Sequence, residues 1–397
     1  MRILFANDAI GDAGGVQAYL AAVIPAVAAR GHHVALLYVH EEPDGEGSPA
    51  PAGAPHFRAG GRAGEALAEV RAWAPDVVFS HNMSDLDLER GLIGIAPVVK
   101  MMHGYFGTCI GGLKAHRFPR AEPCSRVFGP ACLALYVPRR NGSLRPAYVA
   151  RQWRWANEQN ALFADYAAVV TASGHMRTEY VRNGVADERA HAVPLFSTLA
   201  AADEPAPEPA EFRVLFLGRM THLKGGDVLV RAMARASAIV GRPLALTLGG
   251  DGPQRAEWEA LAAKLRVRAE FRGWVDEDEK LRLIRGASML AMPSVWPEPF
   301  GLAGLEAGSQ GVPSVAFDVG GIREWLAEGV NGRLAPGDPP RAEGLAETIA
   351  WAASHPAELS AMRPRALDAA RRMSLDAHVM RLDEVLQAAA SPHVGTA

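Results

Sequence analysis

The chain has 397 residues, of which 49% are apolar and 21% are charged, a composition typical of a globular protein with two or three domains. It excludes a disordered chain, a collagen-like repeat and a disulfide-rich miniprotein. The 41 basic and 44 acidic residues give a formal charge of −3, so no global charge excess indicates a nucleic-acid binder.

The sequence offers no candidate for a membrane helix, because no window approaches the roughly 20 consecutive apolar residues that a span needs. The apolar run near the start, residues 3–6, is too short for the core of a signal peptide. We therefore expect a cytoplasmic protein. Peripheral attachment at the inner face of a membrane stays open at this point.

Short apolar and β-branched runs alternate with helical patterns along the whole chain. The expected strands of the first half are residues 3–6, 34–39, 77–80, 98–102 and 168–172. Those of the second half are residues 214–217, 244–248, 269–271, 289–292 and 314–317. Such runs are typical of strands buried on both faces and joined by helices in parallel βαβ units. Each half opens with a strand, a glycine-bearing turn and a helix, so we expect an α/β fold with two Rossmann-like, doubly wound domains.

A linker separates the two expected domains. Residues 200–211 hold three prolines at alternate positions and no apolar residue larger than alanine, which favours a semi-extended connection. We expect domains over residues 1–199 and 212–374, and a last helix within 375–397 that crosses back onto the first domain. Residues 43–61, rich in proline and glycine, are expected to form an exposed loop.

Gly14 and Gly15 follow the first expected strand and open the next helix. Glycines at this place let backbone amides approach an anionic group at a helix N-terminus. A plain tight turn is the alternative, and the spacing lacks the full G-x-G-x-x-G fingerprint of a dinucleotide site.

Polar residues follow two further expected strands of the first half. His81 and Asn82 come after strand 77–80, and His103 comes after strand 98–102. Open parallel sheets bind ligands at the carboxyl ends of their strands, so we expect these side chains to face a cleft. His81 and Asn82 are candidates for contact with a substrate in that cleft, with a structural role as the alternative.

The segment between positions 100 and 155 holds ten basic residues and one acid, Glu122, with tyrosines and tryptophans interleaved. Long segments with few regular signals are often functional. We expect a surface for something anionic, either an anionic ligand, with Arg139 and Arg140 as candidate contacts, or acidic membrane headgroups. A solvated basic face is the alternative, and single-stranded nucleic acid suits the same mix of cations and rings.

All three cysteines, Cys109, Cys124 and Cys132, fall in this segment. Three thiols cannot pair completely, and cytoplasmic chains rarely keep disulfides. The spacing lacks any C-x2-C pair, so zinc binding is only weakly indicated, and packed thiols or one reversible pair are favoured.

The second expected domain opens with Gly218-Arg219 at a strand end and Lys224 just before a helix. Arg219 offers a bidentate fork to phosphate oxygens and Lys224 a compact point charge, so the two suit a diphosphate. Only five of the 41 basic residues are lysines, which makes Lys224 informative. Two surface cations beside a turn are the alternative.

Two weaker signals follow in the same half. Residues 249–253, Gly-Gly-Asp-Gly-Pro, come after a strand, and Gly250 permits a close approach of backbone to ligand. Trp274 and Val275 come after the next strand and are expected to offer backbone groups to a nucleotide base. Partly buried packing is the alternative for Trp274.

The strongest motif is residues 293–306, P-S-V-W-P-E-P-F-G-L-A-G-L-E. Glu298 ends a loop and Glu306 lies inside the following helix, so the two carboxylates can address two parts of one polyhydroxylated ligand. The free amides that start this helix and face a phosphate belong to Phe300, Gly301 and Leu302. The alternative is one carboxylate that satisfies the helix dipole and one unrelated helical glutamate.

Taken in order, these motifs resemble the retaining glycosyltransferases of family four, which have the GT-B fold, two Rossmann-like domains facing a cleft. The resemblance covers essentially the whole chain, and the string E-P-F-G-L-x-x-L-E carries it most specifically. It implies that the first domain binds an acceptor and the second a nucleotide-diphosphate sugar, a UDP-sugar or GDP-sugar. It implies no cofactor and no metal, and it argues against a nucleic-acid partner.

The resemblance also implies roles for single residues. Arg219 and Lys224 bind the donor diphosphate, Glu306 the nucleotide ribose and Glu298 the hydroxyls of the donor sugar, against which His103 is placed. Attack from the face that the diphosphate leaves retains configuration, with the leaving phosphate as base and the cations stabilising its charge.

The acceptor is expected to be a lipid-linked or other anionic glycan precursor in polysaccharide biosynthesis. A sugar-nucleotide 2-epimerase of the same fold, which turns over its donor without an acceptor, is one alternative. An inactive partner protein that binds a sugar nucleotide is another, although an idle site has no need of four charged groups.

Overall fold

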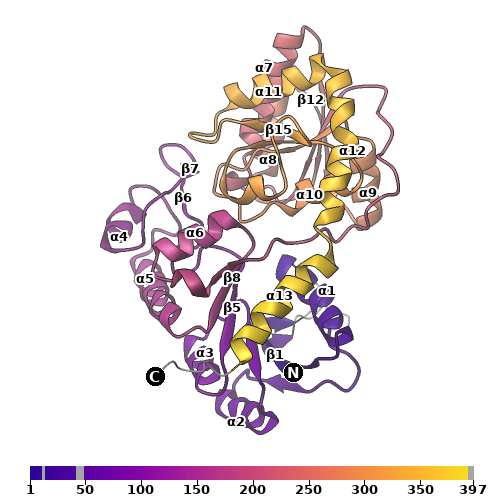
Figure 1. Cartoon of the computed structure of the whole chain (residues 1–397). Coiled ribbons are helices and arrows are strands. Elements are labelled where there is room, and N and C mark those ends of the chain that lie inside the picture. The colour runs from indigo at the N-terminus through magenta and orange to yellow at the C-terminus, as the bar shows by residue number, and fades with distance from the viewer. Residues whose placement is uncertain (11–13, 42–48, 392–397) are drawn as a thin grey trace.

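The computed structural model describes residues 1–10, 14–41 and 49–391, which form two α/β domains (Figure 1). The first domain, lower in the view, has a seven-stranded parallel sheet in the order β3-β2-β1-β4-β5-β8-β9. Its strands are β1 (Arg2–Ile10), β2 (His33–Glu41), β3 (His56–Arg58), β4 (Val77–Ser80), β5 (Val98–Met102), β8 (Ala168–Thr171) and β9 (Ala190–Ala192).

Helices cover both faces of this sheet. They are α1 (Gly15–Ala29), α2 (Ala63–Trp73), α3 (Leu86–Ile93), α4 (Pro130–Tyr136), α5 (Pro146–Ala161) and α6 (Gly174–Arg182). A short antiparallel hairpin of β6 (Ala115–His116) and β7 (Glu122–Pro123) projects beside them. Short 3-10 helices span Leu162–Ala164 and Asp187–Arg189.

The second domain repeats the plan with six parallel strands in the order β12-β11-β10-β13-β14-β15. The strands are β10 (Arg213–Leu217), β11 (Ala245–Gly249), β12 (Arg268–Gly273), β13 (Met289–Met292), β14 (Ser314–Phe317) and β15 (Gly332–Ala335). The helices are α7 (Gly226–Val240), α8 (Arg255–Leu265), α9 (Glu277–Arg285), α10 (Leu302–Ser309), α11 (Ala342–Ser354) and α12 (Pro356–Arg372), with 3-10 turns at His222–Lys224 and Gly320–Glu324; α13 (Leu375–Ala390) follows them in the chain.

Alternation along the strands explains why both faces of a sheet are covered. In β1, Ile3 and Phe5 pack into one core while Leu4 and Ala6 pack into another, because successive side chains of a strand point to opposite faces. All of them are almost fully buried. The predicted α/β class with two Rossmann-like parallel sheets is confirmed.

The last helix, α13, leaves the second domain and packs against the first (yellow in Figure 1). It contacts α1, β4 and β5, and Val379 and Leu382 are buried in the core that includes Phe5. The expected helix range extends to residue 397, and residues 392–397 lie outside the described part of the chain.

The segment 200–211 is extended, and part of it is hydrogen-bonded to the second domain. Ala202 and Ala206 donate backbone hydrogen bonds to Ser309 and Gln310 of the second domain, at 2.8 Å each. The guanidinium of Arg363 donates to the carbonyl of Ala206 at 3.1 Å. The connection is therefore packed onto the second domain along part of its length.

The expected exposed loop over 43–61 is wrong at its end. His56–Arg58 form β3, which pairs with Leu36–Tyr38 of β2, and Phe57 is buried. The sequence there lacks a β-branched run, so pairing with β2 decides the strand. Residues 42–48 lie outside the described part.

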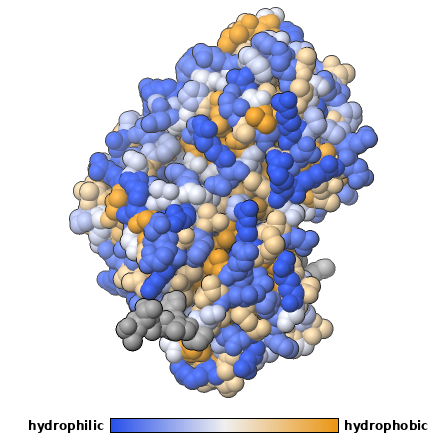
Figure 2. Space-filling view, in the orientation of Figure 1, coloured by the Kyte–Doolittle hydropathy of each residue, from blue (hydrophilic) through white to orange (hydrophobic). Residues whose placement is uncertain are grey.

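None of the helices that the structure describes is long and apolar enough to cross a membrane. Apolar and polar side chains are mixed over the face seen in Figure 2.

Candidate active site

Both sheets reverse their strand order beside their first strand, between β1 and β4 and between β10 and β13. Such a switch point, at the carboxyl ends of the strands, is where doubly wound sheets bind ligands. A cavity of about 720 Å³ lies there in the second domain. Its walls include Gly218, Arg219, Gly250, Trp274, Val275 and Glu306, so six of the residues singled out from sequence share one cavity.

Three turns form the floor of this cavity and are held together through backbone. The amide of Gly218 donates to the carbonyl of Gly249 at 3.1 Å, and the amide of Gly250 donates to the carbonyl of Gly273 at 2.6 Å. Gly250 has a φ of 125°, and a Cβ there would collide with the carbonyl oxygen of Gly218. Only glycine therefore allows the turns after β10 and β11 to approach so closely.

Glu306 sits in the cavity wall with two partners already in place. Lys280 Nζ lies 2.9 Å from its Oε1, and the Thr198 hydroxyl donates to the same oxygen at 2.9 Å. A carboxylate that accepts from an ammonium and a hydroxyl can equally accept from the hydroxyls of a ribose. Sequence reasoning missed both partners, although Lys280 is one of only five lysines.

Two residues of the cavity are open to solvent. Trp274 is 86% exposed, so the alternative that it packs partly buried is wrong. Arg219 is exposed, and within the described residues it has no ion-pair partner. A free guanidinium and a free indole face are suited to phosphate oxygens and to a nucleotide base, respectively.

Lys224 and Glu298 form an ion pair beside this cavity. Lys224 Nζ lies 2.8 Å from Oε1 and 3.0 Å from Oε2 of Glu298, and the Trp296 indole donates to Oε2 at 2.8 Å. Glu298 is buried, so these donors offset the desolvation of its charge. Trp296 was not singled out from sequence, although it lies inside the strongest motif.

Helix α10 begins directly after this pair. Gly301, its N-cap, has a φ of 94°, and no side chain caps the helix. Phe300 is buried, and its carbonyl accepts from the Trp325 indole at 2.8 Å. The first amides of the helix, at Leu302 and beyond, therefore start at the site with a positive dipole end.

A second cavity, of about 530 Å³, opens between the two domains. The first domain contributes Lys114, Cys124 and His175 to its walls, and the second contributes Pro297, Gly320 and Arg323. The amide of Gly174 donates to Glu324 Oε1 across the gap at 2.6 Å. The backbone carbonyl of Glu298 accepts from Gly321 at 2.7 Å, so the Lys224–Glu298 pair borders the interdomain space.

In the first domain, His81 and His103 meet at the ends of β4 and β5. His81 Nδ1 lies 2.9 Å from His103 Nε2. Burial is the main cause that lowers the pKa of both rings, helped by the Lys100 charge and, for His81, by His103; the pKa of His81 lies well below its ordinary value and that of His103 is about 3. Both rings are therefore neutral at pH 7.

Tyr19 and His378 extend this ring cluster. The Tyr19 hydroxyl lies 2.8 Å from Nε2 of His378, whose Nδ1 lies 2.8 Å from the carbonyl of Pro194. Since the carbonyl only accepts, Nδ1 of His378 carries the proton and its Nε2 accepts from Tyr19. Burial lowers the pKa of His378 to about 4. Sequence reasoning missed both residues, because α13 brings His378 here from the other end of the chain.

Lys100 and Glu89 form a buried ion pair below the histidines. Lys100 Nζ lies 2.7 Å from Glu89 Oε1 and also donates to the carbonyl of His81 at 2.5 Å. The Ser80 hydroxyl donates to Glu89 at 2.8 Å. This network fixes the end of β4 directly before His81.

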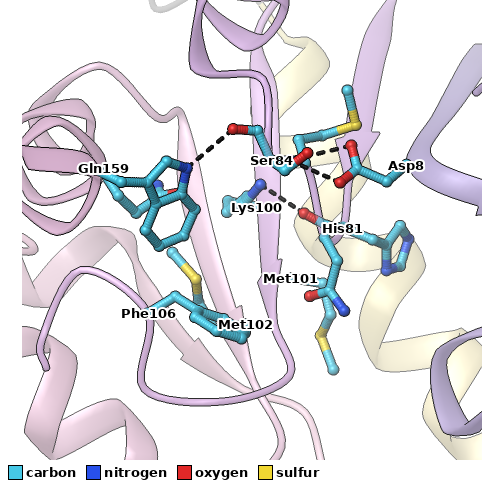
Figure 3. Close-up of a pocket in the computed structure, with 11 residues that line it drawn as sticks. Asp8, His81, Ser84, Lys100, Met101, Met102, Phe106 and Gln159 are labelled. Carbon is cyan, nitrogen blue, oxygen red and sulfur yellow. Dashed lines mark hydrogen bonds between the residues drawn. The ribbon is translucent and has the colours of Figure 1, made fainter. Parts of the chain in front are cut away.

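A cavity of about 190 Å³ opens above this network, and Figure 3 shows its lining. His81 and Asn82 both line it, next to Met102, Phe106 and Trp155. Dashed lines in Figure 3 mark the Trp155 indole donating to the carbonyl of Ser84, whose amide donates to the Asp8 carboxylate. The cavity combines aromatic surface with a carboxylate and an amide, a mixture that suits a hydroxyl-bearing ring.

The other predicted site residues lie elsewhere. Arg139 pairs with Glu122 at 3.5 Å, and the Arg140 guanidinium lies 4.7 Å from the Phe118 ring centroid. Neither lines the cavity that holds His81 and Asn82. Gly14 and Gly15 lie exposed at the start of α1, at the same strand-end edge as His81.

Cys109, Cys124 and Cys132 are free thiols that line one small cavity together with His116. Burial raises the pKa of the Cys124 thiol. In the part of the chain that the structure describes, no three His, Cys, Asp or Glu side chains are grouped so as to hold a metal ion. The geometry lends no support to the zinc alternative.

Comparison with known proteins covers both domains. Residues 13–196 match the family model described as Glycosyltransferase Family 4, and residues 211–355 match the one described as Glycosyl transferases group 1. The chain is 38% identical over 145 residues to an uncharacterized glycosyltransferase of Methanocaldococcus jannaschii, covering 36% of this chain and 34% of that protein. It is 28% identical over 323 residues to a glycogen synthase of Mycobacterium tuberculosis, covering 78% and 67%.

The match to the archaeal protein thus spans about a third of that relative's length. Among solved structures, Anabaena HepE in complex with UDP and glucose is similar over 98% of this chain and 99% of its own, with a TM-score of 0.67 and 19% identity. This likeness concerns the fold. Since the two family models between them reach into both domains, and the fold agrees, the chain belongs to the family-four glycosyltransferases of the GT-B fold.

Proposed function

We propose that this glycosyltransferase moves a sugar from a nucleotide-diphosphate sugar, a UDP-sugar or GDP-sugar, to an anionic glycan precursor with retention of configuration. The observation that carries the proposal is the cavity of about 720 Å³ that joins Arg219 and Glu306. Beside it lies the Lys224–Glu298 pair. The two cations can bind a diphosphate, and the two carboxylates can each accept hydrogen bonds from the hydroxyls of one sugar ring.

In this proposal the donor lies along the ends of β10 to β13. Glu306 accepts from the ribose hydroxyls, replacing part of what it now accepts from Lys280 and Thr198. Val275 offers its backbone to the base, and Trp274 offers an exposed indole. HepE, whose structure holds UDP, supports a UDP-sugar over a GDP-sugar.

The reaction breaks the bond between the sugar C1 and the diphosphate and forms a bond from C1 to an acceptor oxygen. Charge develops on the leaving diphosphate, where Arg219, Lys224 and the first amides of α10 stabilise it. The acceptor hydroxyl gives its proton to the leaving phosphate on the same face. These cations supply the charge that a divalent metal provides in other transferases, so we propose a metal-independent reaction.

Glu298 and His103 hold the transferred sugar in this scheme. Glu298, oriented by Lys224 and Trp296, accepts from its hydroxyls. His103 is neutral, because burial keeps its pKa at about 3, so it exchanges hydrogen bonds with the sugar without adding charge near the reacting carbon. The first domain presents the acceptor from the cavity lined by His81 and Asn82. We further propose that this acceptor is lipid-linked and that the enzyme contacts an anionic membrane surface.

A ligand screen followed by product analysis tests the function. Nucleoside diphosphates and their sugars are screened for an increase in melting temperature, since a ligand that binds the folded state stabilises it by mass action. UDP and UDP-sugars are expected to give the largest increase. Loss of that increase in Glu306→Ala, with a Glu347→Ala control, places the nucleotide in this cavity. A wild-type increase in Glu306→Ala, or an inverted anomeric configuration in the product by NMR, overturns the proposal.

A further inference from the structure

The exposed apolar side chains of the described residues are concentrated in one stretch of the first domain. Ten large apolar side chains are at least a third exposed, and six of them lie between positions 118 and 148. They are Phe118, Val127, Leu133, Val137, Leu144 and Tyr148. Together with the arginines around them they form a surface over the β6–β7 hairpin, α4 and the start of α5, here called the α4 face. Figure 1 shows these elements on one side of the domain, and Figure 2 shows apolar side chains among hydrophilic ones at that edge.

Arginines surround these apolar side chains. Six exposed arginines lie on the α4 face, and within the described chain none has an ion-pair partner; they are Arg117, Arg126, Arg140, Arg145, Arg151 and Arg154. The two lysines of the segment are instead buried, Lys100 against Glu89 and Lys114 against Glu179. The cationic charge at this surface is therefore carried by arginine.

Some of these arginines contact the exposed rings directly. The Arg140 guanidinium lies 4.7 Å from the ring centroid of Phe118, and that of Arg151 lies 5.4 Å from that of Tyr148. A cation above an aromatic ring, both at the surface, is an amphipathic unit with a polar tip and an apolar body.

We infer that the α4 face docks onto an anionic lipid bilayer, with the arginines on lipid phosphates and the aliphatic and aromatic side chains inserted among the headgroups. A small soluble anion would satisfy the arginines but leave Leu133, Val137 and Leu144 in water. A second copy of the chain bound through the same face would bring arginines against arginines, and like charges oppose that contact. A bilayer with anionic headgroups above an apolar interior can contact both the arginines and the exposed apolar side chains of the α4 face.

The α4 face also adjoins the proposed catalytic cleft. Pro123, Cys124 and Ser125 line the interdomain cavity, and the next two residues, Arg126 and Val127, lie exposed on the α4 face. Docking would bring the mouth of the cleft close to the headgroups. A lipid-linked acceptor, which rests on the proposed function, can then reach the cleft without leaving the bilayer.

Vesicle flotation with the full chain tests this inference. Wild-type protein is mixed with neutral phosphatidylcholine vesicles and with vesicles of equal parts phosphatidylcholine and phosphatidylglycerol. We expect binding to the anionic vesicles alone, weakened by high salt because screening shortens electrostatic attraction. Equal binding to both vesicles, binding to neither, or release of bound protein by inorganic phosphate at matched ionic strength overturns the inference.

Two variants separate charge from insertion, and each has a matched control. R145E/R151E removes two unpaired cations, and L133S/V137S removes two exposed aliphatic side chains; each is expected to weaken vesicle affinity about tenfold or more. The controls are R242E and I239S, which change exposed residues of the second domain and are expected to bind as wild type. Wild-type affinity in either α4-face variant, or loss of binding in either control, overturns the inference.

The thermal shift given by UDP distinguishes this inference from the proposed function. It is expected to be unchanged in all four variants, since none of the altered residues lines the donor cavity. A wild-type chain that floats with anionic vesicles but shows no shift with any nucleotide refutes the proposed donor site and leaves the docking surface standing. The reverse result refutes the docking surface alone.

Discussion

The imidazole rings of His81 and His103 face each other, with Nδ1 of the first 2.9 Å from Nε2 of the second. Both are neutral because burial lowers their pKa values, so one ring donates and the other accepts. Nε2 of His81 is buried and has no partner within the described residues. The hydrogen bond of the His81 ring within the described residues therefore goes to the ring of His103.

The buried histidines predict a stability that falls in mild acid. Their folded pKa values lie below the unfolded value of about 6.5, so the unfolded chain binds protons that the folded chain excludes. The stabilisation is present above pH about 6.5 and declines as the pH falls toward the folded pKa of His103, about 3. Chemical denaturation at several pH values should give a shallower decline for H81Q/H103Q than for wild type. H33Q, which changes an exposed histidine, should leave the slope unchanged; equal slopes in all three proteins would contradict this account.

The same contact makes His81 a positioning residue for His103. His81→Phe keeps an aromatic ring but loses the nitrogen that contacts His103, and we expect kcat to fall about tenfold with the donor KM little changed. His81→Asn restores an amide near the position of Nδ1 and should recover most of the rate. Steady-state kinetics check both. If Asn and Phe are equally slow, packing rather than the hydrogen bond is what His81 supplies.

Substitution of Lys224 should lower both the activity and the stability of the protein, whereas substitution of Arg219 should weaken donor binding alone. Lys224→Ala leaves the buried Glu298 carboxylate without its cation, so we expect loss of activity together with a loss of about 2 kcal/mol in the free energy of unfolding. Arg219→Ala removes an exposed guanidinium and should weaken nucleotide binding at unchanged stability. Denaturant titration and calorimetry with UDP give the two quantities. A destabilised Arg219→Ala would show that its guanidinium has a structural role.

The buried pair Glu89–Lys100 predicts a non-additive double-mutant cycle. Lys100→Met leaves the carboxylate of Glu89 buried and uncompensated, at a cost of about 3–5 kcal/mol in unfolding free energy. Adding Glu89→Gln removes that charge, so the double variant should be more stable than Lys100→Met alone. Additive losses in the four proteins of the cycle would show that the two side chains do not depend on each other.

Gly250 should tolerate no side chain. Gly250→Ala places a methyl group against the Gly218 carbonyl and requires an unfavourable φ of 125°, so the two turns must separate and UDP affinity should fall about tenfold or more. Gly64→Ala is the matched control, because no atom lies within 4 Å of a Cβ added at Gly64, which is part of α2. Calorimetry with UDP compares them. An unchanged affinity in Gly250→Ala would mean that the nucleotide does not rely on this turn.

Sequence reasoning found the long buried strands and the motifs at their ends, because both are local signals. The expected strand 289–292 agrees with β13, and 98–102 agrees with β5. It missed β3, β9 and β15, which are three or four residues long and carry His or Arg. Their pairing is decided by neighbouring strands, not by their own pattern.

The missed site residues have the same explanation. Thr198 reaches Glu306 across 108 positions, and His378 reaches Tyr19 across 359, distances over which one sequence carries no pairing signal. The exposure of Trp274 was equally unreadable, because an isolated tryptophan after a strand has the same composition whether it packs or projects. Lys280 had a usable signal, the scarcity of lysine, but no motif around it.

Helix α13 has a consequence for how the protein is made. Val379, Leu382, Val385 and Leu386 complete the same core as Ile3 and Phe5, so the first domain lacks part of its interior until α13 has left the ribosome. The half translated first is therefore finished last. A first-domain fragment that ends at the linker would expose the apolar face of its sheet that α13 covers. Such a fragment is expected to aggregate when expressed alone and to be monodisperse when the second fragment, with α13, is expressed with it.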